Sequence, residues 1–438
     1  MSREFIHSNI GVNTDGHLTF AGVDTVEVAR EYGTPCMLLD EHRIRSRIRK
    51  YRNAMEKYFP LGSLPFYASK ALSFCELARI IASEGIGIDC VSPGEIETAL
   101  RGGISPSMIA YHSNNKTDEE IETAILKGIG CFVVDGFDEL FAINEIAARH
   151  ARRQKVMLRI TPGIDPHTHK AISTGNIDSK FGFAVQTGQA FEGVRCALEL
   201  EAIELEGFHC HIGSQIFDAL PFCDAADKMM EFTAEIRARL GYFPKQLDLG
   251  GGFAVRYIDT DREIDIERNI SLIAAHIIER AKAHGIEREM LPSIILEPGR
   301  SIVADAGMTL YTVGSVKEID GFRNYVSVNG GMTDNPRYAL YQSAYTMYIA
   351  NKADVCADYE CTVAGRCCES GDLLGEHIML ARPQRNDILA VAVTGAYNYS
   401  MASNYNRVAR PPIIIVNEGK MRIGVRRESN EDILKLDI

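Results

Sequence analysis

Short runs of hydrophobic residues alternate with amphipathic segments between residues 66 and 297. Eight of these runs have the length and composition of β-strands: Phe66–Lys70, Gly87–Ser92, Met108–His112, Cys131–Asp135, Val156–Thr161, Leu205–His211, Gln246–Gly250 and Ser293–Glu297. The segments between them, such as Phe74–Ala82 and Glu119–Leu126, carry apolar residues at helical spacing. Eight strand–helix units in about 260 residues predict a (β/α)8 barrel rather than an open doubly wound sheet, although both folds alternate strands and helices.

The pattern changes after residue 300. Five segments beyond this point are short, strand-like and separated by turn residues: Met308–Gly314, Tyr325–Val328, Glu360–Ala364, Ile388–Val393 and Pro412–Val416. They predict a mainly antiparallel β domain of sandwich or barrel-like form. The N-terminal segment is too short to fold alone and is expected to join this domain. The predicted division is therefore residues 37–300 for the barrel, and residues 301–438 together with 1–36 for the β domain.

Length and composition indicate a globular protein with a large hydrophobic core. The chain has 438 residues, of which 46% are hydrophobic and 24% are charged. The formal net charge is −12 and no dense run of Lys or Arg occurs, so we expect no nucleic-acid partner. No apolar stretch approaches the roughly 20 residues that span a bilayer, and the first residues lack the apolar core of a signal peptide. These features predict a cytoplasmic enzyme without a membrane partner.

The cysteines do not form a recognisable metal site. There are 11 of them, scattered along the chain without the paired spacing of a zinc site. In a protein that is not exported, most are expected to be small buried hydrophobic residues. The neighbouring pair Cys367 and Cys368 is the exception to examine.

Polar residues gather where the predicted barrel strands end, which is the face that carries the active site in (β/α)8 enzymes. Lys70 ends the first strand and His211 ends the sixth. The third strand runs into His112–Asn115, the seventh into Gly250–Gly252 and the eighth into Glu297–Arg300. Each group alone has an ordinary structural explanation, since a strand-end lysine, for example, can extend its stem toward water. Their shared position favours a site.

The residue types in these groups suit a phosphorylated heterocycle. A desolvated Lys70 can form a Schiff base, and the glycines let backbone N–H groups approach a phosphate, unless they only form a tight turn. Glu297 needs a cation beside it, either a protonated ring or Arg300. His209 and His211 face the same side of a strand, but no nearby carboxylate or thiolate completes a metal site, so no metal is predicted. Together the groups describe a pyridoxal phosphate site.

The motifs of the chain resemble those of the fold-type III pyridoxal phosphate-dependent decarboxylases. In the barrel they are YASKA at 67–71, RITPG at 159–163, SKFGF at 179–183, HIGSQ at 211–215, GGG at 250–252 and EPGR at 297–300. Beyond the barrel they are GMTDNPR at 331–337, CESGD at 368–372 and GAY at 395–397. The resemblance extends in order over nearly the whole chain, and within that family it is strongest to the diaminopimelate decarboxylases.

The resemblance implies a role for each matching residue. Lys70 would hold the cofactor as a Schiff base, His211 would stack on its ring, and Glu297 would keep the pyridine nitrogen protonated. Cys368 would be the proton donor, because it directly precedes Glu-Ser-Gly-Asp, although the adjacent Cys367 departs from the family pattern. The remaining cofactor contacts would come from Ser214, Gly251, Gly252, Gly299, Arg300 and Tyr397. The substrate would be held by Arg300, Arg337, Tyr341, Glu369 and Tyr397.

The implied reaction is the decarboxylation of meso-2,6-diaminopimelate to L-lysine and CO2 in lysine biosynthesis. Decarboxylases of ornithine, lysine or arginine are the enzymatic alternative, but their substrates end in a cation, which argues against Arg337 at that position. Alanine racemases share the barrel but carry an arginine where this chain has Glu297. A pyridoxal phosphate-binding protein without activity would be a barrel alone, without Cys368 and Tyr397. The family also implies a homodimer whose active sites take residues from both subunits.

Overall fold

The structure, a computed structural model, describes residues 5–164 and 179–438. The chain divides into two compact units, each with its own sheets. Unit 1 comprises Met1–Ser46, Val255–Glu263 and Arg300–Ile438, and unit 2 comprises Arg47–Ala254 and Ile264–Gly299. The predicted strand-rich domain and the predicted barrel correspond to these units in outline, while residues 1–4 of the predicted N-terminal segment lie outside the described part.

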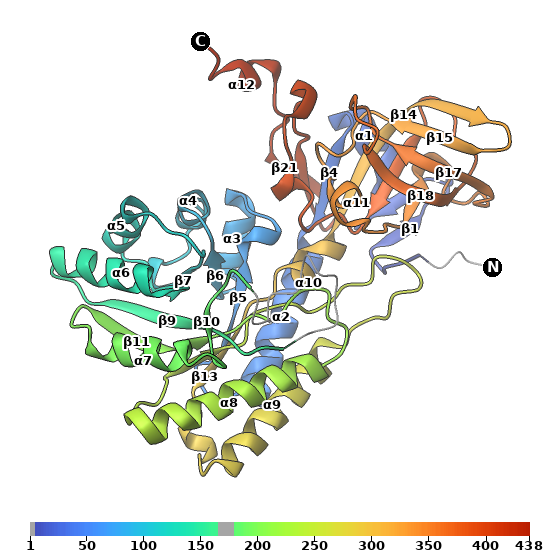
Figure 1. The fold of residues 1–438 in the computed structure, drawn as a ribbon. Coiled ribbons are helices and arrows are strands. Elements are labelled where there is room, and N and C mark those ends of the chain that lie inside the picture. The colour runs from blue at the N-terminus through green and yellow to red at the C-terminus, as the bar shows by residue number, and fades with distance from the viewer. Residues whose placement is uncertain (1–4, 165–178) are drawn as a thin grey trace. The chain divides into compact units, whose positions relative to one another are not determined.

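Unit 2 is a closed barrel of parallel strands, which confirms the fold predicted from the hydrophobic pattern (Figure 1). Pairing of the last strand with the first closes the ring. The short β10 (Phe183–Ala184) pairs with the end of β9. In chain order the barrel strands are β5 (Leu64–Ala68), β6 (Gly87–Cys90), β7 (Ile109–Tyr111), β8 (Cys131–Val134), β9 (Gln154–Thr161), β11 (Ile203–His209), β12 (Gln246–Asp248) and β13 (Ser293–Leu296).

Amphipathic helices connect the barrel strands, and α5 shows how the sequence sets their ends. Thr117 and Glu120 form a capping box at its N-terminus, Ile121 and Ile125 are buried on one face, and Gly128 ends it in a left-handed conformation. No helix in the described residues combines the length and hydropathy needed to cross a membrane. The helices are α2 (Glu41–Tyr58), α3 (Cys75–Ser83), α4 (Pro93–Arg101), α5 (Asp118–Lys127), α6 (Phe137–Arg149), α7 (Gln189–Glu199), α8 (Leu220–Leu240) and α9 (Ile266–Ala283).

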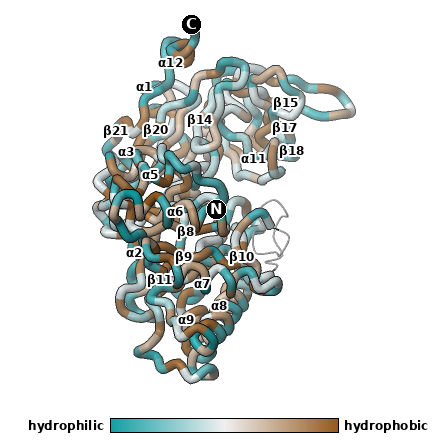
Figure 2. Tube along the Cα trace, turned by 60° about the vertical axis from the view of Figure 1, so that its left-hand side comes forward, coloured by the Kyte–Doolittle hydropathy of each residue, from teal (hydrophilic) through white to brown (hydrophobic). Residues whose placement is uncertain are grey.

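The barrel interior contains a small apolar cluster. Val133, Met157 and Ile295 are buried there on β8, β9 and β13, and Phe66 and Cys131 pack against them. Figure 2 shows the hydrophobic colour along β8 and β9 that corresponds to this cluster. Since the interior is filled with side chains, polar groups that act on a ligand must lie at the ends of the strands.

Unit 1 is a mainly antiparallel β domain, as predicted, with two small departures. The pairs β15–β17 and β4–β20 are parallel. Helices α1 (Thr25–Tyr32), α10 (Arg300–Val303), α11 (Arg337–Tyr341) and α12 (Asn430–Leu434) are shorter than most barrel helices. The strands are β1 (Ile10–Val12), β2 (Leu18–Phe20), β3 (Val23–Asp24), β4 (Cys36–Asp40), β14 (Gly307–Ile319), β15 (Arg323–Val328), β16 (Met347–Ile349), β17 (Tyr359–Ala364), β18 (Leu373–Leu380), β19 (Ile388–Ala392), β20 (Ile413–Asn417) and β21 (Lys420–Val425).

The units differ from the predicted boundaries in two places. The predicted barrel began at residue 37, but β4 lies between β14 and β20 in the sheet of unit 1. Residues 255–263, which follow β12, also belong to unit 1. Both segments are short apolar or irregular stretches, and local patterning cannot say which sheet such a stretch will join.

Candidate active site

Lys70 lies in a short turn of 3-10 helix, Ser69–Ala71, directly after β5, and its side chain is exposed. The end of the eighth strand packs against this turn. Gly299 makes that contact possible, because a Cβ atom at this position would lie 3.0 Å from the Cβ atoms of Ala68 and Ala71. Two of the predicted site residues, Lys70 and Gly299, are therefore brought together by closure of the barrel.

Glu297 follows β13, is 4% exposed, and lies beside two histidines from other strand ends. Nε2 of His112 lies 2.8 Å from its Oε1, and Nε2 of His209 lies 3.3 Å from its Oε2. Burial alone would raise the pKa of Glu297, but the two histidines outweigh burial and hold the pKa well below its usual value. The carboxylate is therefore ionised although it is buried.

Three further ionisable residues surround this cluster, and sequence reasoning gave none of them a role, although Arg159 begins the RITPG motif. Asp89 lies on β6, Arg159 on β9 and Asp248 on β12. Burial and the neighbouring Glu297 raise the pKa of Asp248 well above its usual value. Burial likewise raises the pKa of Asp89 and lowers that of Arg159. Each of these residues interrupts an apolar strand run, and that interruption is the signal that could have found them.

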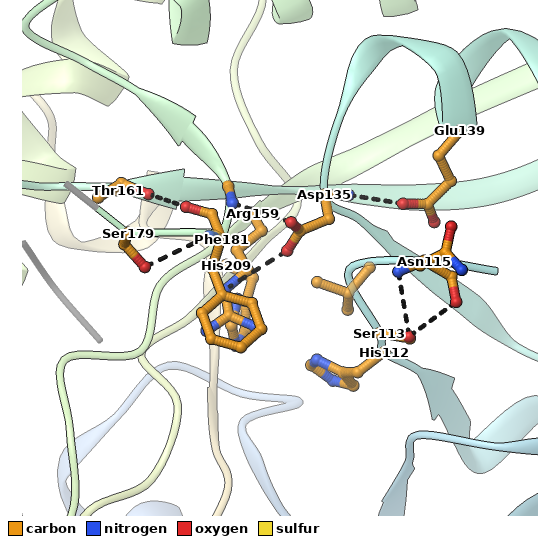
Figure 3. A network of polar contacts seen from close by, with 12 residues as sticks. His112, Ser113, Asn115, Asp135, Glu139, Arg159, Thr161, Ser179, Phe181 and His209 are labelled. Carbon is orange, nitrogen blue, oxygen red and sulfur yellow. Dashed lines mark hydrogen bonds and ion pairs between the residues drawn. The ribbon is translucent and has the colours of Figure 1, made fainter. Parts of the chain in front are cut away.

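Arg159 extends between an acid and an aromatic ring at the end of β9, as Figure 3 shows. Its Nε lies 3.8 Å from Oδ1 of Asp135, and its guanidinium carbon lies 4.2 Å from the ring centroid of Phe181. The N–H of Gly182 donates to Asp135 at 3.1 Å, and the hydroxyl of Thr161 donates to the carbonyl of Phe181 at 2.7 Å. The motifs at 159–163 and 179–183 therefore meet at one strand end.

His211 lies in the loop that directly follows β11, and Ser214 lies three residues further on, half-buried. The N–H of Gly251 donates to Nδ1 of His211 at 3.3 Å. Although part of the ring is accessible, its removal from water and the neighbouring cations Lys70 and Arg159 lower the pKa of His211 well below the usual value. The imidazole is therefore neutral at pH 7.

The glycine run after β12 permits close approaches of the backbone. A Cβ atom on Gly251 would collide with the carbonyl oxygen of Glu297, and one on Gly252 would lie 2.5 Å from the carbonyl oxygen of Gly213. The amides of Gly250 and Gly251 already donate within the fold. A tight turn therefore accounts for the first two glycines. The N–H of Gly252 takes part in no hydrogen bond in the described part of the chain and is the one available to an anion.

The acid–histidine cluster corrects one step of the sequence argument. His112, His209 and Glu297 place three possible metal ligands within 4.8 Å of one another. The expectation of no metal rested on the lack of a carboxylate near His209, and that premise was wrong. The cluster suits the protonated ring nitrogen of a bound heterocycle equally well. The contact with His112 lacks hydrogen-bond geometry, so Oε1 of Glu297 accepts no hydrogen bond from the residues that the structure describes and could accept one from such a ring.

In unit 1, two buried arginines lie around one tyrosine ring. Arg300 begins α10, is 6% exposed, and donates from Nη1 to the hydroxyl of Tyr257 at 2.8 Å. Its guanidinium carbon lies 4.7 Å from the ring centroid of Tyr397. Arg337 begins α11 and lies 5.4 Å from the same ring and 4.9 Å from the ring of Tyr341. Four predicted substrate residues are thus gathered in one cluster.

The guanidinium of Arg337 has no acid beside it among the residues that the structure describes. It is 6% exposed, its Nε lacks a hydrogen-bond partner, and no ion pair within residues 5–164 and 179–438 includes it. A buried cation without a counter-charge is costly unless a ligand supplies one. The cluster is therefore suited to receive an anionic group.

Cys368 and Glu369 lie in the loop after β17 and are exposed, whereas Cys367 is half-buried. Burial and the nearby Asp372 raise the pKa of Cys367 to about 11, so its thiol is almost entirely protonated at pH 7. In the described part of unit 1, neither Cys368 nor Glu369 makes a hydrogen bond or ion pair with the arginine cluster.

Comparison with known proteins gives a consistent result. Residues 41–304 match the family described as pyridoxal-dependent decarboxylase, pyridoxal binding domain. The chain is 45% identical to the diaminopimelate decarboxylase of Halalkalibacterium halodurans, covering 99% of this chain and 98% of the relative, and 43% identical to that of Bacillus subtilis, with the same coverage. A crystal structure of diaminopimelate decarboxylase from M. jannaschii in co-complex with L-lysine matches with a TM-score of 0.91 and 33% identity over 98% of both chains. Similarity in sequence and in fold therefore extends over the same, nearly complete span.

Proposed function

This chain belongs to the diaminopimelate decarboxylases of the pyridoxal-dependent decarboxylase family, and on that premise we propose how its residues divide the work. The reaction is the decarboxylation of meso-2,6-diaminopimelate to L-lysine and CO2. The observation that carries the proposal is Glu297, an ionised and buried carboxylate whose Oε1 accepts no hydrogen bond from the described residues. The ring N–H of pyridoxal 5'-phosphate would supply the missing donor.

The barrel residues would bind and tune the cofactor. Bound pyridoxal 5'-phosphate supplies the electron sink that is needed when CO2 leaves an amino acid. Lys70 would attach it covalently through its amine, and Glu297 would favour the charged form of the ring nitrogen. His211, neutral at pH 7, would contact the ring without adding a competing positive charge. The other cofactor contacts would come from Ser214, Gly251, Gly252, Gly299, Arg300 and Tyr397.

The residues of unit 1 would recognise the substrate and return a proton. Diaminopimelate carries an ammonium and a carboxylate at its distal end as well as at the reacting end. Arg337 would bind a carboxylate in fork geometry, and Glu369 would bind the distal ammonium. Arg300, Tyr341 and Tyr397 would complete the substrate site. Cys368 would donate the proton that replaces the lost carboxylate.

We also propose that the enzyme is a homodimer in which Cys368 and Glu369 act in the active site of the partner subunit. Both side chains are exposed in the single chain, which leaves them accessible to a second copy. The expected absence of a bound metal and of nucleic-acid or membrane partners, and the expected cytoplasmic location, stay predictions.

A direct assay tests the reaction and the attachment site together. The purified protein, loaded with pyridoxal 5'-phosphate, is incubated with meso-diaminopimelate, and CO2 and lysine are measured. We expect equal amounts of both products, and no CO2 from ornithine, lysine or arginine. Borohydride reduction followed by peptide mapping should place the cofactor on Lys70. Attachment at another lysine would overturn the assignment of Lys70 without affecting the reaction itself.

A mixing experiment tests the shared site. The Lys70→Ala and Cys368→Ala homodimers should each be nearly inactive. In a mixed dimer with shared sites, one site carries both defects and the other carries neither. Random equal mixing makes roughly half of the dimers mixed, so roughly a quarter of all sites should be intact. If Cys368 acts within its own chain, no activity returns, provided that size analysis of tagged subunits shows that they have exchanged.

A further inference from the structure

Two loops of unit 1 leave neighbouring strands at the same edge of the sheet. β15 and β17 are parallel partners, with Val326 paired to Val363, so their C-terminal ends lie side by side (Figure 1). The loop after β15, residues 329–336, leads into α11 and Arg337. The loop after β17, residues 365–372, carries Cys368 and Glu369. Residues proposed to act on the substrate therefore lie on the second loop and directly after the first.

The side chain of Asp372 bridges these two loops. It is 3% exposed. Its Oδ1 accepts the N–H of Met332 on the first loop at 2.6 Å, and its Oδ2 accepts the N–H of Cys367 on the second loop at 2.6 Å. Hydrogen bonds from backbone amides to a buried carboxylate are charge-assisted and stronger than neutral ones. One carboxylate is thus hydrogen-bonded to the backbone of both loops.

Glycines make room for this carboxylate. A Cβ atom on either Gly331 or Gly365 would collide with Oδ1 of Asp372, and Gly331 also has a φ of 152°. The backbone adds a second link, because the N–H of Arg366 donates to the carbonyl of Gly330 at 2.9 Å. The two loops are therefore shaped around the aspartate.

The backbone around the cysteine pair is held by hydrogen bonds, while the side chains of Cys368 and Glu369 stay accessible. The N–H of Cys367 donates to Asp372, that of Cys368 donates to Oδ1 of Asn406 at 2.9 Å, and that of Glu369 donates to the carbonyl of Cys367 at 2.8 Å. Three consecutive amides are thus satisfied inside one chain. Cys368 and Glu369 nevertheless remain exposed. The fold orders this loop before any substrate arrives.

From these contacts we propose that Asp372 is a positioning residue for the reaction. Its carboxylate holds the loop of Cys368 and Glu369 in register with the loop that leads to Arg337, and thereby sets where the thiol stands when it donates its proton. Asp372 itself touches neither substrate nor cofactor. The inference rests on the proposed role of Cys368.

A matched pair of variants tests the proposal. Asp372→Asn keeps the shape of the side chain but replaces one acceptor with an N–H2 group, so one of the two amides must lose its partner. Asp334→Asn is the control: Asp334 is also buried, at 6% exposure, and accepts the N–H of Gly331 at 3.1 Å and the hydroxyl of Tyr311, but within the described part of the chain it accepts no hydrogen bond from the second loop.

Two measurements on the full-length holoenzyme distinguish the variants. Amide hydrogen exchange followed by mass spectrometry should become about tenfold faster in both loops of Asp372→Asn, and in the first loop alone of Asp334→Asn. The kcat for diaminopimelate should fall about ten- to a hundredfold in Asp372→Asn, while its KM and the visible spectrum of the cofactor change little, since proton donation is affected and binding is not.

Several results would overturn the proposal. Faster exchange in only one loop of Asp372→Asn would show that the carboxylate does not link the two loops. An unchanged kcat would show that this link does not affect the reaction. If Asp372→Asn fails to fold, exchange of the wild-type protein in mild denaturant decides instead: the amides of Met332 and Cys367 should open with one common free energy, and separate openings would refute the bridge. Failure of the proposed function would be seen differently, as full activity of Cys368→Ala.

Discussion

In the barrel mouth, the buried carboxylate of Glu297 lies beside two histidines of the same unit, whereas in unit 1 the buried guanidinium of Arg337 has no acid partner among the described residues. The carboxylate is held by contacts within its own unit and lacks only a hydrogen-bond donor at Oε1. The guanidinium needs a whole counter-charge. The difference supports the proposed division between the units, in which the barrel would tune a ring nitrogen of the cofactor and the β domain would receive an anionic group of the substrate.

Lys70→Ala tests the barrel half of this comparison and should have the largest effect. Loss of the covalent attachment should lower kcat at least about a thousandfold, since removing a residue that forms a covalent bond in catalysis commonly has this effect. Cofactor should still bind, because the contacts of Glu297 and the glycine turn do not involve the amine. CO2 release and the visible spectrum measure the two effects. Lys127→Ala, at an exposed lysine on α5, should behave like wild type. Substantial turnover by Lys70→Ala would refute the assignment.

Arg337→Ala tests the unit 1 half. Removing one partner of a buried charge pair typically costs about 2–5 kcal/mol, which corresponds to a loss of roughly thirtyfold to several thousandfold in kcat/KM for diaminopimelate. Cofactor affinity should hardly change, so the cofactor titration and the steady-state kinetics should respond differently. Arg323→Ala removes an exposed arginine of the same unit, paired with Glu376, and serves as the control. Equal kinetics for Arg337→Ala and wild type would remove the anion site from the mechanism.

A smaller effect concerns the free energy of unfolding, whose dependence on pH should have opposite signs for one buried group in each unit. Burial lowers the pKa of His209 to about 4, so as pH falls from about 6.5 the unfolded chain takes up a proton before the folded one, and stability is lost down to about pH 4. Burial raises the pKa of Asp334 to about 6, so the folded chain takes up its proton first, and this contribution to stability is lost as pH rises through about 6. Each contribution is on the order of 3 kcal/mol.

Denaturant unfolding measured from below pH 4 up to pH 8 covers both windows and measures these contributions through two variants. His209→Gln should flatten the loss of stability toward low pH, and Asp334→Asn should remove the cost that the ionised carboxylate imposes above pH 6. Variants that leave both slopes unchanged would show that these groups are not buried as described.

Most of the barrel site could be predicted because the hydrophobic pattern locates the end of each strand. Once eight parallel strands close into a ring, every strand end falls at one rim, so Lys70, His211 and Glu297 had to converge. The sequence could not predict which ionisable residues at this rim contact one another. The pairing of Glu297 with His112 joins residues of different strands, and only the closed ring brings them within 2.8 Å.

The β domain was less accessible to sequence reasoning. Its proposed site residues were recognised from resemblance to a family, since Cys368 and Tyr397 stand in loops and Arg337 begins the short helix α11, and neither setting carries a periodic signal. The bridge from Asp372 to Met332 spans 40 positions and joins a side chain to a backbone amide. Because every residue except proline has a backbone N–H group, such a contact requires no particular residue type at the second position. Sequence pattern and spacing therefore do not predict it.

The interrupted course of unit 1 has a consequence for how the polypeptide is made. All five residues of β4 are buried, and Leu39 within it pairs with Gly307 on one side and Ile415 on the other. A ribosome releases residue 39 early and residue 415 near the end of synthesis, so this strand waits, unpaired, while the whole barrel emerges. Unpaired apolar strands are the segments most prone to wrong association. Nascent chains in which the barrel has emerged from the ribosome but β20 has not should therefore aggregate or recruit chaperones through the neighbourhood of β4.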